Sequence, residues 1–109
     1  MKKEYVQVIT TLATQEEAEQ LARHLVEQRL AGCVQVGSPL VSFYQWQGKV
    51  ERDKEYQVQI KSRLDLVESL IAAISSHHPY ETPEILVLPI VRGSEAYLAW
   101  LDQELRSAP

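Results

Sequence analysis

The sequence has little cysteine, no excess of positive charge and no long hydrophobic run. Its single cysteine, Cys33, cannot form an internal disulfide, which is typical of proteins in a reducing compartment. The net charge of −4 argues against nucleic-acid binding, because phosphates bind to basic surfaces. No apolar run approaches the roughly 18 residues of a membrane-spanning helix, and Met1–Glu4 leads into a strand-like segment without a signal peptide. We expect a soluble cytoplasmic protein that neither inserts into a membrane nor binds nucleic acid.

Recognisable catalytic motifs are also missing. The chain has no Gly-rich phosphate loop, no C-x₂-C or H-E-x-x-H zinc spacing, and no serine or cysteine nucleophile with a base nearby in the sequence. Repeats, low-complexity tracts and linkers are absent as well, and 109 residues suffice for one core. We therefore interpret residues 1–109 as a single domain that binds a ligand and is not an enzyme.

The segment 77–84 concentrates polar chemistry in a short space, with two imidazoles, a phenol and two carboxylates. Pro79 and Pro83 disfavour the α conformation in the residues that precede them. A helix should therefore end near His77, and a stiff extended connector should lead into the apolar run 85–88. Polar groups on a connector between two ordered elements are a common place for function.

Hydrophobic periodicity and turn signals predict the remaining elements. Thr14 with Glu17 is a capping box, Ser62 with Asp65 can cap a second helix, and Gly32 can stop the first. The run 85–91 is apolar on both faces, which favours an internal strand. The expected elements are a strand 5–10, a helix 15–29, a strand 33–46 with a bulge or bend at 37–39, a strand 49–62 after a tight turn at 47–48, a helix ending near 76, a strand 85–91 and a helix 97–105.

This order, β-α-β-β-α-β-α, identifies the fold class. Its first six elements are those of the α+β, ferredoxin-like split βαβ arrangement, and the last is an added C-terminal helix. Two helices on one face of a four-stranded sheet suit a chain of this length.

The hairpin is too long for a compact domain. The strand 49–62 would span about 46 Å at roughly 3.3 Å per residue, whereas a domain of this size has a radius of gyration of about 13 Å. Its end carries aromatic residues, and lone ribbons are marginal in water. We expect a closed homo-oligomer in which hairpins extend neighbouring sheets. The alternative is a strand that breaks near Arg52 and Asp53 and leaves a short hairpin.

Four blocks of sequence, at 31–34, 43–51, 78–84 and 97–100, resemble the CutA family of divalent-cation tolerance proteins. They read AGCV, FYQWQGKVE, HPYETPE and YLAW, and the resemblance covers nearly the whole chain. It implies a ferredoxin-like homotrimer related in architecture to the PII signalling proteins. It also implies Cu(II) binding and a part in metal tolerance.

The resemblance further implies a copper site of a cysteine on the first strand and two adjacent histidines. The histidines correspond to His77 and His78, but the cysteine position falls at Thr10, which removes the thiolate donor. A second family cysteine corresponds to Cys33, a further candidate ligand. The alternatives are that His77 interacts with the negative end of a helix and that Cys33 is a small buried hydrophobic residue.

Aromatic and charged residues of the hairpin and the connector form a second candidate site. In an oligomer they could line a pocket between subunits for a small anionic ligand, as in PII-like proteins, or they could simply pack an interface. These residues are Tyr44, Trp46, Lys49, Glu55, Lys61, Tyr80 and Glu81. The leading function is a trimeric copper-binding protein of metal tolerance. The alternatives are a PII-like signalling module that binds a small ligand, and a structural trimeric scaffold.

Overall fold

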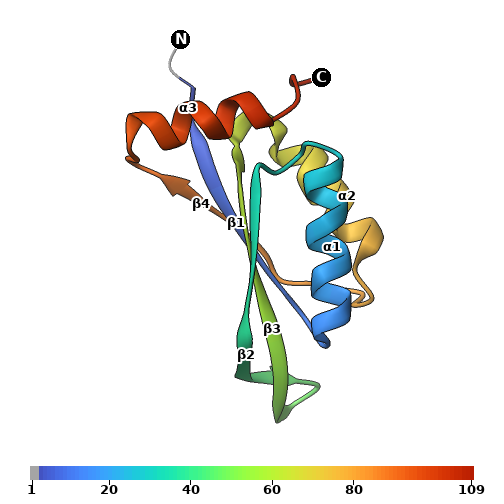
Figure 1. The fold of residues 1–109 in the computed structure, drawn as a ribbon. Coiled ribbons are helices and arrows are strands. Elements are labelled where there is room, and N and C mark those ends of the chain that lie inside the picture. Colours follow the sequence, from blue (N-terminus) through green and yellow to red (C-terminus); the bar gives the residue numbers. More distant parts are fainter. Residues whose placement is uncertain (1–2) are drawn as a thin grey trace.

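The computed structural model describes residues 3–109 as a four-stranded sheet of order β2-β3-β1-β4 that carries helices (Figure 1). Each pair of neighbouring strands is antiparallel. The elements are β1 (Tyr5–Leu12), α1 (Gln15–Glu27), β2 (Cys33–Trp46), β3 (Lys49–Arg63), the short 3₁₀ helix η1 (Leu64–Leu66), α2 (Val67–His77), β4 (Ile85–Ile90) and α3 (Glu95–Glu104). This is the α+β, split βαβ arrangement that the order of elements predicts.

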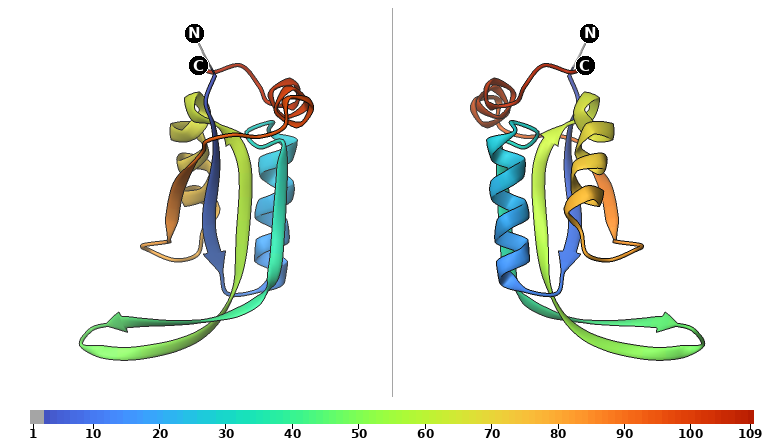
Figure 2. Two further views of the ribbon diagram at one scale, coloured as in Figure 1. Left: turned by 90° about the vertical axis from the view of Figure 1, so that its left-hand side faces the viewer. Right: turned by 90° about the vertical axis from the view of Figure 1, so that its right-hand side faces the viewer.

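The core lies between one face of the sheet and the pair α1 and α2, which cover that face together (Figure 2). Alternate residues of the two central strands point into it, and Val8, Val58 and Ile60 are fully buried. Leu25 of α1 and Ile74 of α2 close the core from the helical side. The alternating apolar residues of the strands and the apolar stripes of the helices thus pack together in one layer.

Helix α1 begins as predicted and ends differently. The Glu17 amide donates to Thr14 Oγ1 at 3.1 Å, and the Thr14 hydroxyl donates to the Glu17 carboxylate at 3.0 Å, so the Thr14 side chain caps the helix. At the other end Arg29, with φ of 56°, takes the left-handed conformation that ends the helix. Gly32 serves another purpose, because a Cβ there would meet the Leu101 side chain at 2.5 Å. It permits α3 to pack closely.

The prediction that Ser62 caps the second helix is wrong. Ser62 is fully buried within β3, and its hydroxyl donates to the Leu30 carbonyl at 2.6 Å. The strand continues to Arg63, η1 follows, and α2 begins only at Val67 without a side-chain cap. Ser62 fills a place in the core that its local sequence does not reveal.

The β2–β3 hairpin projects beyond the rest of the fold (Figure 2), and with it the described residues measure 47 × 25 × 24 Å along their principal axes. Gln47 and Gly48 have φ of 50° and 79° and form the predicted tight turn. The predicted irregularity appears as a register shift between Val36 and Pro39. The alternative of a break near residues 52–53 is wrong, because the pairing of β2 with β3 runs through them.

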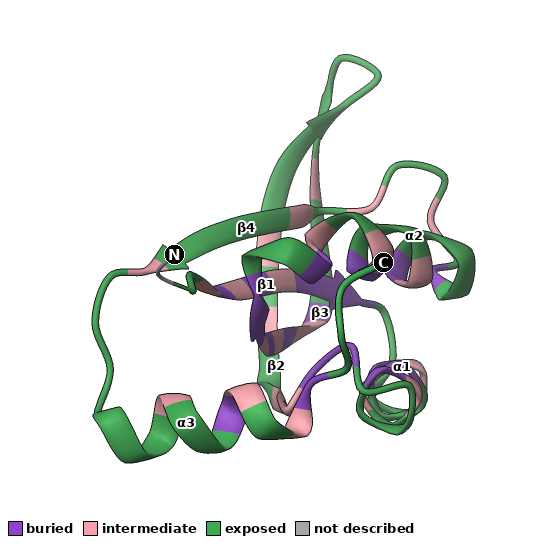
Figure 3. Cartoon of the chain, turned by 90° about the horizontal axis from the view of Figure 1, so that it is seen from above, coloured by how far each residue is buried: buried purple, intermediate pink, exposed green. Residues whose placement is uncertain are grey.

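Strand β4 lies at the edge of the sheet, so the prediction that it is internal is wrong for a single chain. It pairs with β1 on one side, and Leu86, Val87 and Leu88 are exposed (Figure 3). The apolar character of both faces is real, but within residues 3–109 no strand lies on its other side. Residues 3–109 of a single chain do not supply the burial that the sequence pattern indicates.

Helix α3 lies across the end of the sheet where η1 follows β3 (Figure 1). Ser94 caps it by accepting a hydrogen bond from the Tyr97 amide at 3.2 Å. Its Leu101 packs with Leu66 in a second, smaller apolar cluster. In the described part of the chain, each helix is too short or too polar to cross a lipid bilayer.

Candidate functional site

The connector between α2 and β4 holds the histidines that the sequence singles out. Helix α2 ends at His77, and His78 is extended, with φ of −89° and ψ of 131°, as expected for a residue before Pro79. The two imidazoles are therefore attached to backbone of different conformation, helical at His77 and extended at His78. Each has a separate set of contacts.

His78 is buried, with only 8% of its surface exposed. Its Nε2 lies 2.7 Å from the Thr11 carbonyl, which can only accept, so Nε2 carries the proton and donates. The Tyr80 amide donates to Nδ1 at 3.2 Å. Both ring nitrogens are thus used in hydrogen bonds, and the imidazole has no free lone pair for a metal. His78 joins the connector to the end of β1.

His77 is exposed. Its Nδ1 lies 3.0 Å from the Ala73 carbonyl and must donate to it, so in the neutral ring the lone pair resides on Nε2. This contact at the last turn of α2 agrees with the alternative that His77 interacts with the helix end. The His77 ring also stacks on His24 of α1, with ring centroids 4.0 Å apart and planes at 33°. No local sequence signal predicts this contact, because His24 lies on another helix.

The copper donor set that the family resemblance implies does not fit this arrangement as a whole. Thr10 Oγ1 is buried and has no hydrogen-bond partner among residues 3–109, but a neutral hydroxyl is a poor ligand for copper. His78 has no free nitrogen, which leaves His77 as the member of the set that fits. Residues 3–109 also contain no group of three or more His, Cys, Asp or Glu residues placed to hold an ion.

Cys33 lies elsewhere. It pairs with Lys61 on β3, whereas Thr11, which His78 contacts, pairs with Gln57. Along β3, the distance from Gln57 to Lys61 is about 13 Å. Cys33 neighbours Tyr97 of α3, and burial first, then the nearby thiol, raises the pKa of the Tyr97 phenol. The structure therefore does not bring Cys33 together with the histidines.

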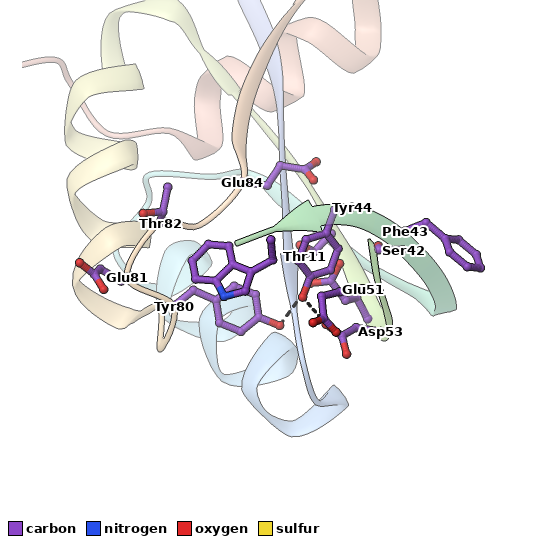
Figure 4. Close-up of a pocket in the computed structure, with 12 residues that line it drawn as sticks. Thr11, Ser42, Phe43, Tyr44, Glu51, Asp53, Tyr80, Glu81, Thr82 and Glu84 are labelled. Carbon is purple, nitrogen blue, oxygen red and sulfur yellow. Dashed lines mark hydrogen bonds between the residues drawn. The ribbon is translucent and has the colours of Figure 1, made fainter. Parts of the chain in front are cut away.

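The second candidate site is a groove of about 640 Å³ between the hairpin and the connector (Figure 4). Of the residues expected at a ligand pocket, five line it: Tyr44, Trp46, Glu55, Tyr80 and Glu81. Its other lining residues are Thr11, Ser42, Phe43, Glu51, Asp53, Thr82 and Glu84. The Phe43 side chain points away from the groove, while Tyr44 points toward Asp53 (Figure 4).

Two phenol–carboxylate pairs order the floor of the groove. The Tyr80 hydroxyl donates to Glu55 Oε2 at 3.2 Å, and the Tyr44 hydroxyl donates to Asp53. Burial and then the charge of Glu55 raise the pKa of Tyr80 to about 12. The hydrogen bond to Asp53 raises the pKa of Tyr44 to about 12. Both phenols therefore remain protonated donors at neutral pH.

Lys49 and Lys61 do not belong to the groove lining. Lys49 follows the hairpin turn and is exposed, and Lys61 donates to Gln35 Oε1 at 2.9 Å at the opposite end of β3. The lining instead contains Glu51 and Asp53, which the sequence analysis missed, and Glu84, which belongs to the polar segment 77–84 but was not assigned to the pocket. Glu51, Asp53 and Glu55 alternate along β3, which places them on one face of the strand and could have revealed them. Their charge favours a cationic partner.

Comparison with known proteins gives a consistent result. The family described as CutA1 divalent ion tolerance protein matches residues 6–104. The divalent-cation tolerance protein CutA of Salmonella newport is 39% identical over 103 residues, which are 94% of this chain and 90% of that protein.

Solved structures agree with the sequence match. CutA1 of Shewanella sp. SIB1 has a TM-score of 0.94 at 34% identity, with 98% of this chain and 100% of that chain covered. The protein from Archaeoglobus fulgidus, described as a periplasmic divalent cation tolerance protein CutA, has a TM-score of 0.91 at 33% identity, with 94% and 99% covered. The chain therefore belongs to the CutA1 family of divalent-ion tolerance proteins.

Proposed function

We propose that this protein serves divalent-cation tolerance by binding Cu(II), and that its working form is a homotrimer. Its family and its curated relatives are named for tolerance of divalent ions, which supports the general role. The observation that carries the metal proposal is His77, an exposed imidazole whose Nδ1 is held by Ala73 while Nε2 keeps its lone pair. Imidazole is a good ligand for Cu(II), which stands at the top of the divalent affinity order.

The apolar surface of a single chain supports the trimer. At the end of the hairpin, Trp46 is 56% exposed and Val50 is 67% exposed, and Leu86 on the free edge of β4 is 54% exposed. A projecting ribbon and an open edge strand both gain stability when they pair with another chain. A closed ring of identical subunits satisfies both in every copy.

A second candidate function is a PII-like module that binds a small ligand in a cleft between subunits. The groove beside Tyr44, Trp46 and Tyr80 favours it, because it combines aromatic faces with oriented phenol donors in about 640 Å³. The carboxylates of the lining favour a cationic ligand over the anionic one expected from the sequence. A neighbouring subunit would have to contribute the positive charge that an anion requires.

Calorimetry on the purified protein separates the two functions. We expect Cu²⁺ to bind with nitrogen and oxygen donors and more tightly than Zn²⁺. The bound ion should show the weak visible bands of a tetragonal site and no intense sulfur charge-transfer band. Saturable binding of a nucleotide without any binding of Cu²⁺ contradicts the metal proposal and favours the PII-like module.

Light scattering tests the assembly. The mass should be about three times the 12.4 kDa of one chain and should persist on dilution. A monomer at micromolar concentration contradicts the trimer and, with it, the PII-like module that uses a cleft between subunits.

We also propose that the protein is cytoplasmic and that it is not an enzyme. The reduced state that Cys33 permits supports the cytoplasm, although the Archaeoglobus relative is described as periplasmic. Fractionation of cells that express the full-length protein tests the location. Recovery in the periplasmic fraction contradicts it.

A further inference from the structure

The fold forms a pair of histidines that are distant in the sequence. His24 lies in the last turn of α1, and His77 is the last residue of α2. Their ring centroids are 4.0 Å apart, and their planes meet at 33°. His24 is half-buried and His77 is exposed, so the pair lies at the surface where the two helices meet.

His77 and His78 differ in what they offer to a cation. His78 uses Nε2 to donate to Thr11 and Nδ1 to accept from Tyr80, so its coordination of a metal would break two hydrogen bonds in a buried place. His77 needs only to keep its Nδ1 contact with Ala73, which fixes the tautomer with a free Nε2. Such a hydrogen bond on the second nitrogen is the usual support of a histidine ligand.

We propose that the divalent cation is held by His24 and His77, across the α1–α2 junction, and that His78 is a positioning residue that ties the connector to β1. This inference rests on the proposed function and replaces the adjacent pair of histidines as its donor set. Two imidazoles that share one ion through nitrogens at about 2.0–2.1 Å have ring centroids about 4.5–5 Å apart. The observed separation is close to this value, but the rings stack, so the His24 ring must turn until its lone pair and the Nε2 of His77 face the same ion.

Oxygen donors lie beside His77 at the same junction. A small cavity of about 200 Å³ is lined by Glu17, Gln20 and Leu21 of α1 and by Ser76, His77, His78 and Pro79, while His24 lies outside this lining. Glu17, Gln20 and His24 are spaced to lie on one face of α1. Because residues 3–109 contain no ready group of three His, Cys, Asp or Glu ligands, the remaining positions fall to water. Two imidazoles with water suit a tetragonal Cu(II) ion.

The test is Cu²⁺ titration of the full-length protein, with calorimetry for affinity and electron paramagnetic resonance for the number of bound nitrogens. Loss of a supporting group around a metal ligand costs about 10–100-fold in affinity, and loss of a ligand should cost no less. We therefore expect His24→Gln and His77→Gln each to weaken binding at least tenfold and to lower by one the number of nitrogens bound to copper. Arg23→Gln, next to His24 on α1, is the matched control and should bind as the wild type does.

His78→Gln separates the two roles. We expect it to lower the melting temperature, because the contacts with Thr11 and Tyr80 change, while it keeps both nitrogens and an affinity within about twofold of the wild type. Undiminished binding by His24→Gln overturns the inference. Loss of binding in a folded His78→Gln protein with normal binding by His24→Gln restores the adjacent pair and leaves the proposed function intact. A wild-type protein that binds no divalent cation overturns the proposed function and the inference together.

Discussion

The two ends of strand β3 have the same kind of sequence and very different surroundings. Near its C-terminal end, Val58 and Ile60 are fully buried under α1 and α2. Near the hairpin turn, Val50 is 67% exposed, and the paired strand β2 exposes Trp46 beside it. An alternating strand describes only which residues share a face, and another element must cover that face to bury it. One end of β3 finds its cover within the chain, and we propose that the other finds it in a second subunit.

The largest effect is expected at the uncovered end. Trp46→Ala should loosen the assembly and cost about 3–5 kcal/mol per subunit, the range for a large aromatic that is truncated when buried. Trp100→Ala on α3 is the matched control. It removes a similarly exposed indole at the covered end and should leave assembly unchanged. Light scattering and thermal melting over a range of concentrations measure both. A fully trimeric Trp46→Ala protein with unchanged melting would remove the hairpin from the interface.

The covered end predicts a loss of stability that does not depend on concentration. Ile74→Ala should cost about 2–5 kcal/mol, because the fully buried side chain leaves a cavity between α2 and the sheet. Ile71→Ala, one turn earlier and 36% exposed, should cost clearly less. Denaturant unfolding gives both values. Equal costs at the two positions would show that burial in a single chain is not what distinguishes them.

An ion-pair network strengthens the covered end, and Asp102→Asn should weaken it by about 1.5–3 kcal/mol. Asp102 accepts from Lys3 at 2.8 Å and from Arg63 at 3.0 Å, and Arg63 is buried. The Lys3 hydrogen bond first, and then Arg63, lower the pKa of Asp102. A lowered pKa gives stability that is present above the unfolded value and is lost as the pH falls through the folded one. The variant should therefore show a weaker loss of stability in acid than the wild type.

The smallest effect is expected in the groove, where Tyr80→Phe removes one hydrogen bond to Glu55 and should cost about 0.5–1.5 kcal/mol. Because the pKa of Tyr80 is raised to about 12, its contribution is complete below the ordinary value near 10 and is lost as the pH rises toward 12. Glu55→Gln should lower the pH at which Tyr80 ionises, which the absorbance of the tyrosinate measures. If that titration curve does not change, Glu55 is not what holds the phenol in its protonated form.

Local sequence signals predicted the local structure well. The Thr14 cap, the Gln47-Gly48 turn and the helix end before Pro79 each depend on residues that lie next to one another in the chain. Ser62 failed as a cap because its partner, the Leu30 carbonyl, comes from another part of the chain. Strand β4 was predicted to be internal because its apolar pattern was visible and its lack of a second neighbour was not.

The groove was predicted in part. Tyr44, Trp46, Glu55 and Tyr80 do line one space, whereas Lys61 was included although the register of β3 carries it to the opposite end. Alternation along a strand tells which residues share a face, but not how far along the sheet they fall from the connector. The position along the sheet is set by the pairing of β3 with β1 and β2.

By itself the sequence determined the order of the elements, the long hairpin and the position at which α2 stops, because propensity, periodicity and proline act over a few residues. Only the tertiary structure decided the partners of the histidines. His77 and His78 are adjacent in the chain, but the helix ends between them, so one ring stays at the surface and the other turns inward to Thr11. The packing of α1 against α2 then places His24 on His77, because each helix must bury its apolar stripe on the same sheet.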